Sequence, residues 1–177
     1  MRREGDINTL RTLFAKLRTR IPDITLRTTL LVGFPGESEA DFTELSEFVE
    51  EMRFDRMGCF AYSEEENTVA AKIPDQVAEE IRQHRADLLM EQQMRIAAEL
   101  NADRIGTVTE AVIEGYDKWS SCYIARTAAD APDIDGRLLI PDADAGTYAI
   151  GQYVQAQITD TADYDLIGEV IAGEYAE

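Results

Sequence analysis

Two segments of this 177-residue chain have residue types and a position that could bind a ligand. The first is residues 33–37, Gly-Phe-Pro-Gly-Glu, which follow an apolar run and precede a helical pattern. In a parallel sheet, such a turn brings free backbone amides and a helix N-terminus together, which favours ligand binding. The alternative is that the glycines only form the turn. A phosphate loop is excluded because no GxxxxGK[ST] pattern is present.

The second segment is residues 62–68, Tyr-Ser-Glu-Glu-Glu-Asn-Thr, a polar loop after the next apolar run. Its three adjacent carboxylates, Glu64, Glu65 and Glu66, could hold a metal ion or attract a cationic substrate. A solvated charge run without a function is the alternative, since most runs of this kind are solvated. Both segments follow strands, so we expect them at the same edge of one sheet.

The elements that position these segments alternate between helix and strand. Apolar residues at helical spacing predict a helix over 10–21, and the apolar run 24–32 predicts a parallel strand buried on both faces. Ser38 with Asp41 predicts a capped helix, and 55–62 predicts a second strand. Two strands do not close a barrel, so we interpret this region as the C-terminal part of a larger βα barrel, of the TIM type, or of a doubly wound sheet.

The second half of the chain has a different pattern. A long helix is predicted from residue 74 to about 101 and suits a connector. Short segments rich in β-branched and aromatic residues follow, separated by turn formers, and predict a small antiparallel barrel of five strands. The fold class is therefore α/β plus all-β. The predicted domains are an α/β part over 1–73, a connector helix over 74–104 and a β-barrel over 105–174.

Charge restricts the partners of this protein. The chain has 35 acidic and 17 basic residues, for a net charge of -18, and residues 102–177 alone have 15 acids and 4 bases. A surface of this sign repels a phosphate backbone and attracts a basic polypeptide. We therefore expect weak binding to nucleic acid and stronger binding to a basic protein.

Cysteine content and hydropathy restrict the location and the chemistry. Cys59 and Cys122 are the only cysteines and lie 63 positions apart in apolar segments, so we expect two buried thiols, no disulfide and no metal site. No run approaches the roughly 20 apolar residues of a membrane-spanning helix, and the N-terminus lacks the pattern of a signal peptide. These features predict a cytoplasmic protein that does not bind membranes.

Several motifs resemble those of a known enzyme family. Residues 27–37 with Asp41 and Phe42, and residues 60–63 with Thr68, are similar to the late strands and loops of radical S-adenosylmethionine methylthiotransferases. Further motifs resemble the RimO type, which modifies an aspartate of a ribosomal protein, and its C-terminal TRAM domain: residues 74–77, 129–136 and 163–168.

The resemblance implies a cofactor pocket and a docking surface. S-adenosylmethionine would contact Arg3, Leu31, Val32, Gly33 and Phe34. Substrate-docking positions, taken from the loop and from the acidic barrel, are Tyr62, Ser63, Glu65, Glu66, Trp119, Asp130, Asp133 and Asp135. For Trp119, packing over the end of the barrel is the alternative. Asn67 departs from the family, which commonly has glycine there, but asparagine tolerates the left-handed backbone conformation.

The resemblance also implies two four-iron four-sulfur clusters, one of which cleaves S-adenosylmethionine to a radical while the other serves sulfur donation. Such clusters need cysteine ligands, and the chain has no CxxxCxxC motif. We therefore expect an enzyme part that is inactive alone, with no metal ligands and no catalytic residue of its own, and a basic protein of the small ribosomal subunit as partner. The alternatives are a fragment of a transfer-RNA methylthiotransferase and a non-catalytic acidic binding module. Glu65 and Glu66 argue against the RNA-modifying branch, in which an Arg-Pro-Gly run is common at this place.

Overall fold

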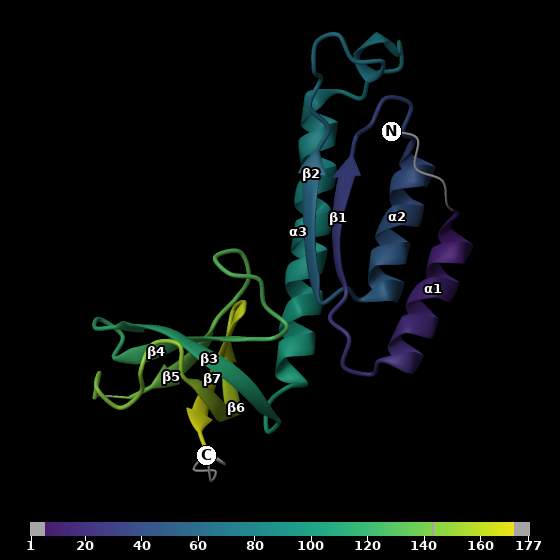
Figure 1. Ribbon diagram of the computed structural model, residues 1–177. Coiled ribbons are helices and arrows are strands. Elements are labelled where there is room, and N and C mark those ends of the chain that lie inside the picture. Colours follow the sequence, from purple (N-terminus) through teal and green to yellow (C-terminus); the bar gives the residue numbers. More distant parts are fainter. Residues whose placement is uncertain (1–5, 143, 172–177) are drawn as a thin grey trace. The chain divides into compact units, whose positions relative to one another are not determined.

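The computed structural model describes residues 6–142 and 144–171 and divides into two compact units. The first unit ends at Ile96 and the second begins at Ala97, so the boundary lies within the long helix (Figure 1). The three-part division expected from the sequence stays a prediction. Each unit is described by itself below.

The first unit alternates between helix and strand as the sequence predicts (Figure 1). Strands β1 (Arg27–Val32) and β2 (Arg56–Ala61) pair in parallel, with Arg27 opposite Arg56 and Val32 opposite Ala61. Its other elements are α1 (Ile7–Arg20), α2 (Glu39–Met52), a short 3-10 helix η1 (Ala70–Lys72) and most of α3 (Glu79–Ala102). The carboxyl ends of both strands therefore meet at one edge.

Helix α2 forms where its cap and its apolar face predict it. Ser38 and Asp41 form a complete capping box, and Phe48, Val49 and Met52 are buried. Phe48 contacts the ring of Phe14 on α1 with 6.3 Å between ring centroids. The expectation that β1 is buried on both faces is wrong: among its residues only Val32 is fully buried, because β2 is its one neighbouring strand in the described residues.

Helix α3 begins later than predicted. It starts at Glu79 instead of residue 74, because the side-chain amide of Gln76 donates to the carbonyls of Ala70 and Ile73 and holds the preceding segment in a turn. Its buried face is also unexpected. Leu89 and Ile96 are buried, but they share that face with the polar residues Arg85 and Gln93.

The second unit is a closed barrel of five strands, which confirms the predicted strand number. Hydrogen-bonded neighbours follow the order β3-β4-β5-β7-β6. The expectation of an entirely antiparallel barrel is wrong, because β5 and β7 pair in parallel while β7 also pairs with β6 to close the barrel. The strands are β3 (Val108–Asp117), β4 (Cys122–Thr127), β5 (Leu138–Pro141), β6 (Tyr153–Ala162) and β7 (Asp165–Val170).

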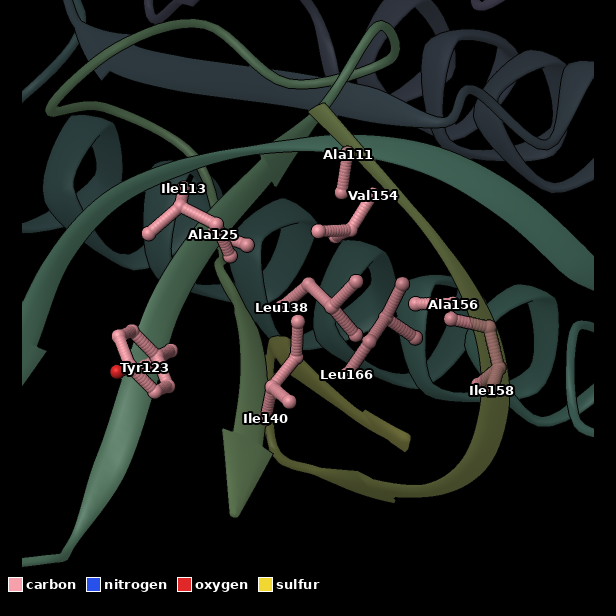
Figure 2. Close-up of a cluster of buried hydrophobic side chains, with 10 residues drawn as sticks. All are labelled: Ala111, Ile113, Tyr123, Ala125, Leu138, Ile140, Val154, Ala156, Ile158 and Leu166. Atoms are coloured by element: carbon pink, nitrogen blue, oxygen red, sulfur yellow. The ribbon is translucent and has the colours of Figure 1, made fainter. Parts of the chain in front are cut away.

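Alternating residues of all five strands fill the barrel with a compact apolar core (Figure 2). Tyr123 is the largest member and is 1% exposed. Its hydroxyl donates to the carbonyl of Asp144 at 2.9 Å and accepts from the amide of Tyr148 at 3.0 Å. The hydroxyl of Tyr123 is therefore a polar atom in the core, and Asp144 and Tyr148, between β5 and β6, satisfy its hydrogen bonds.

Candidate functional site

The two predicted segments meet at the carboxyl edge of the β1–β2 sheet. The amide of Tyr62, one residue beyond β2, donates to the carbonyl of Val32, the last residue of β1, at 2.8 Å. Gly33 follows with a φ of 72°, a left-handed conformation that favours glycine. The chain then turns at Phe34, whose carbonyl accepts from the amide of Glu37 at 2.9 Å, and enters α2.

A cavity of about 300 Å³ opens between these segments. It is lined by Leu31, Phe34, Tyr62, Ser63, Glu65, Thr68, Val69 and Ala70. Phe34 and Tyr62 meet edge to face with 5.3 Å between ring centroids. The Tyr62 hydroxyl is buried and has no hydrogen-bond partner within the described residues. A buried polar atom without a partner beside an apolar cavity is the pattern expected where a ligand supplies the missing bond.

The cavity includes residues of both predicted sets. Leu31 and Phe34 were predicted to contact a cofactor, and Tyr62, Ser63 and Glu65 to dock a substrate. Val32 and Gly33 are buried and do not line the cavity, while Glu66 is exposed on the adjoining loop. Arg3 lies outside the described residues.

The carboxylate loop has an ordered turn. Thr68 donates its hydroxyl to the carbonyl of Glu65 at 2.9 Å, and Asn67 has a φ of 66°, which confirms that asparagine accepts the left-handed conformation here. Glu64, Glu65 and Glu66 are exposed. Over 6–142 and 144–171, no three or more histidine, cysteine, aspartate or glutamate side chains are grouped to hold a metal ion. The loop therefore presents solvated negative charge.

Two arginines of α3 contact the loops behind this cavity, and sequence reasoning missed both. Arg82 donates to the carbonyl of Tyr62 at 2.8 Å, and its guanidinium lies 5.7 Å from the centroid of the Tyr62 ring. Arg85 is 4% exposed and donates to Glu37 at 2.7 Å and also to Glu39. The sequence contained a signal for them. Arg82 and Arg85 are three positions apart, which places them on one helix face, and Glu37 and Glu39 after the glycine turn are possible acidic partners.

The electrostatics around Arg85 favour its charged form. Burial by itself would lower the pKa of Arg85, but the hydrogen bonds to Glu39 and Glu37 outweigh burial and raise the pKa above its ordinary value. One oxygen of Glu37 accepts from both Arg85 and the amide of Gly33, the latter at 2.9 Å. The ion pair is therefore connected directly to the backbone of the glycine turn.

The predicted docking residues of the barrel differ in exposure. Trp119 is 97% exposed, so the alternative of packing over the barrel end is wrong. Asp130 is buried and accepts from the hydroxyl of Thr127 at 2.6 Å. Asp133 and Asp135 line a separate cavity of about 190 Å³ that also contains basic side chains. Of the acidic residues in the 130–135 loop, Asp130 therefore stabilises the loop itself and is not available on the surface.

The cysteines do not suit iron binding. Cys122 is buried as expected, whereas Cys59 is only half-buried, because β2 has a single neighbouring strand in the described residues. Burial, with the negative charge of Glu37, raises the pKa of Cys59 to about 11, which disfavours the thiolate that a metal needs. The two residues lie in different units. Neither cluster implied by the resemblance fits the residues present.

Comparisons with known proteins identify first the class of the second unit and then the relatives of the whole chain. A family model described as TRAM domain matches residues 105–171, so the closed five-stranded barrel is a TRAM domain. The chain is 47% identical over 171 residues to "Ribosomal protein uS12 methylthiotransferase RimO" of Pelobacter propionicus, covering 96% of this chain and 37% of that protein. The protein of the same name from Geobacter sulfurreducens is 46% identical over 173 residues, covering 97% and 38%.

A third relative of that name, from Clostridioides difficile, is 44% identical over 88% of this chain and 34% of its own length. The chain therefore spans little more than a third of the curated relatives that it matches. These similarities confirm the resemblance to methylthiotransferases of the RimO type. Within the described part of the chain, no helix combines the length and the apolarity needed to cross a membrane.

Proposed function

We propose that this chain is the C-terminal part of a ribosomal-protein aspartate methylthiotransferase, in which it completes the S-adenosylmethionine pocket and docks the substrate. The observation that carries the proposal is the cavity of Leu31, Phe34 and Tyr62 at the carboxyl edge of the sheet, in a chain about 45% identical to RimO proteins over most of its length. An apolar cavity with one buried hydroxyl suits the aromatic base and the ribose of such a cofactor. Val32, Gly33 and Arg3 would complete this side of the pocket.

When bound together with two four-iron four-sulfur clusters, S-adenosylmethionine supplies the radical and the methyl group of the reaction. The residues of this chain hold and orient it: Leu31 and Phe34 exclude water from one face, and the Tyr62 hydroxyl offers a hydrogen bond. The clusters need cysteines that this chain lacks. We therefore propose that the 177 residues alone are inactive.

The substrate, we propose, is a lysine- and arginine-rich protein of the small ribosomal subunit, which would place the reaction in the cytoplasm. The relatives are named as methylthiotransferases of ribosomal protein uS12. Negative charge on the loop of Ser63, Glu65 and Glu66 and on the barrel favours a cationic partner and opposes an RNA. On the barrel, Trp119, Asp133 and Asp135 would form a docking surface of their own, and the buried Asp130 would act only by holding its loop.

Charge reversal tests the docking role. Glu65→Arg with Glu66→Arg in the full-length enzyme should weaken binding to uS12, measured by isothermal titration. The matched control is Glu44→Arg with Glu47→Arg, which changes the net charge equally on the exposed face of α2. An equal loss of affinity in both double variants would show that only the total charge matters and would contradict a docking role for the loop of Glu65 and Glu66.

The RNA-modifying alternative is tested by titrating transfer RNA at low salt. We expect weak binding, and submicromolar, salt-sensitive binding would support the RNA branch instead. Anaerobic reconstitution of the 177 residues with iron and sulfide tests inactivity. Cluster absorbance in stoichiometric amount would contradict the proposal that the cluster ligands lie elsewhere.

A further inference from the structure

We infer that Arg82 and Arg85 of α3 are positioning residues that hold the cavity at the sheet edge in its ligand-binding shape. The inference rests on the proposed function of that cavity and adds the device that sets its geometry. Neither arginine lines the cavity, so both act through residues that do. Arg82 donates to the Tyr62 carbonyl and lies against Gly33, and Arg85 shares the carboxylate of Glu37 with the Gly33 amide.

The cavity walls have few bonds of their own. Beyond the paired strands, the bond from the Tyr62 amide to the Val32 carbonyl is the last link between β1 and β2 in the described residues. Phe34 and Ser63 therefore belong to two loops that follow β1 and β2 and are not part of the paired strands. Loops of this kind take their conformation from what packs behind them, and here that is α3.

Arg82 supports both loops at once. Its guanidinium donates to the Tyr62 carbonyl at 2.8 Å, and its aliphatic part lies directly against Gly33. A Cβ built on Gly33 would lie 2.2 Å from Cγ of Arg82. Backbone and side chain are thus in the closest contact that a glycine permits, so the position of Arg82 sets the position of Gly33.

Arg85 fixes the same turn through Glu37. The Glu37 side chain is 13% exposed, and its oxygen Oε1 accepts from Arg85 at 2.7 Å and from the Gly33 amide at 2.9 Å. Without Arg85 the carboxylate would be a buried unpaired charge and would turn toward water. The Gly33 amide would then lose its acceptor, and Phe34 would lose its fixed place in the cavity wall.

A positioning role of Arg85 can be distinguished from a role in stability by comparing removal of Arg85 alone with removal of both Arg85 and Glu37. Arg85→Met leaves a buried carboxylate, whereas Arg85→Met with Glu37→Met replaces the whole pair by apolar groups, which restores most stability. The double variant removes the acceptor of the Gly33 amide outright, so the exchange of this amide tests Arg85 only in Arg85→Met, where Glu37 is still present. Arg85→Lys keeps the charge and should recover part of the function. Arg95→Met is the matched control, since it removes an α3 arginine whose pair with Glu50 is about half exposed.

The first readout is hydrogen exchange of the Gly33 amide by NMR in the 177-residue chain, and the second is the dissociation constant for S-adenosylmethionine in the full-length holoenzyme. In Arg85→Met we expect exchange at least about tenfold faster and affinity weaker by about tenfold to a hundredfold, and in the double variant a similar loss of affinity with most stability restored. The Arg95→Met control should change affinity by about twofold or less.

An Arg85→Met variant with wild-type exchange and wild-type affinity would overturn the inference. If the wild-type holoenzyme binds no S-adenosylmethionine, the proposed function fails, and the exchange rate of Gly33 still decides whether Arg85 positions the turn.

Discussion

Replacing Gly33 by alanine tests the packing at the sheet edge most directly. The residue has a φ of 72°, and an added Cβ would meet Arg82 Cγ at 2.2 Å and Arg82 Cβ at 2.8 Å. The left-handed conformation costs alanine about 1 kcal/mol, and forcing a methyl group into filled space costs about 2 kcal/mol more. We expect Gly33→Ala to lower the free energy of unfolding of the first unit by about 3 kcal/mol.

Gly36→Ala is the matched control. Gly36 has a φ of 87°, but nothing lies within 4 Å of an added Cβ, so this variant should lose only the conformational part, about 1 kcal/mol. The assay is urea unfolding followed by far-UV circular dichroism, because most helical residues belong to the first unit. Fluorescence of Trp119 is unsuitable, since that residue is in the barrel.

A rescue variant isolates the contact. Arg82→Ala in the Gly33→Ala background removes the Cγ atom and should recover part of the loss, although Cβ of residue 82 remains close. Equal destabilisation by Gly33→Ala and Gly36→Ala would refute the reasoning, because it would show that the approach of Arg82 costs nothing. No effect of either variant would also refute the left-handed turn.

Three further outcomes are expected. Tyr123→Phe should cost about 1–3 kcal/mol in urea unfolding, because the Asp144 carbonyl and the Tyr148 amide lose their buried partner; an unchanged midpoint would show that water replaces it. Cys59 should react slowly with iodoacetamide at neutral pH and faster as pH approaches its raised pKa of about 11, whereas mass spectrometry showing rapid labelling at neutral pH would contradict that shift. Hydrogen bonds from Ser120 and from the Trp119 amide lower the pKa of Asp117 below its ordinary 3.8. The stability that Asp117 adds should therefore be complete above pH 3.8 and lost as pH falls through the lowered pKa; a thermal midpoint whose acid dependence is the same in Asp117→Asn would refute it.

Local patterns predicted much of the fold. Helical spacing and the Ser38 capping signal predicted α2, and five short β-rich segments predicted the five strands of the barrel. Such patterns involve residues within one or two turns or one strand, so they can be seen without knowing the rest of the chain. The parallel pairing of β5 with β7 was missed, because the closing strand of a barrel is chosen by the path of the whole chain.

The sequence by itself determined the order of elements, the acidic charge, the two loops at one sheet edge and the family relationship. Only the tertiary structure decided which residues hold those loops. Arginine is rarely buried, so nothing in the local sequence of α3 marks Arg85 as a buried residue. Its carboxylate partner Glu37 lies 48 positions earlier in the chain, and a pair so distant in sequence forms only when the helix packs behind the turn. Long-range contacts of this kind follow from packing geometry, which no local pattern contains.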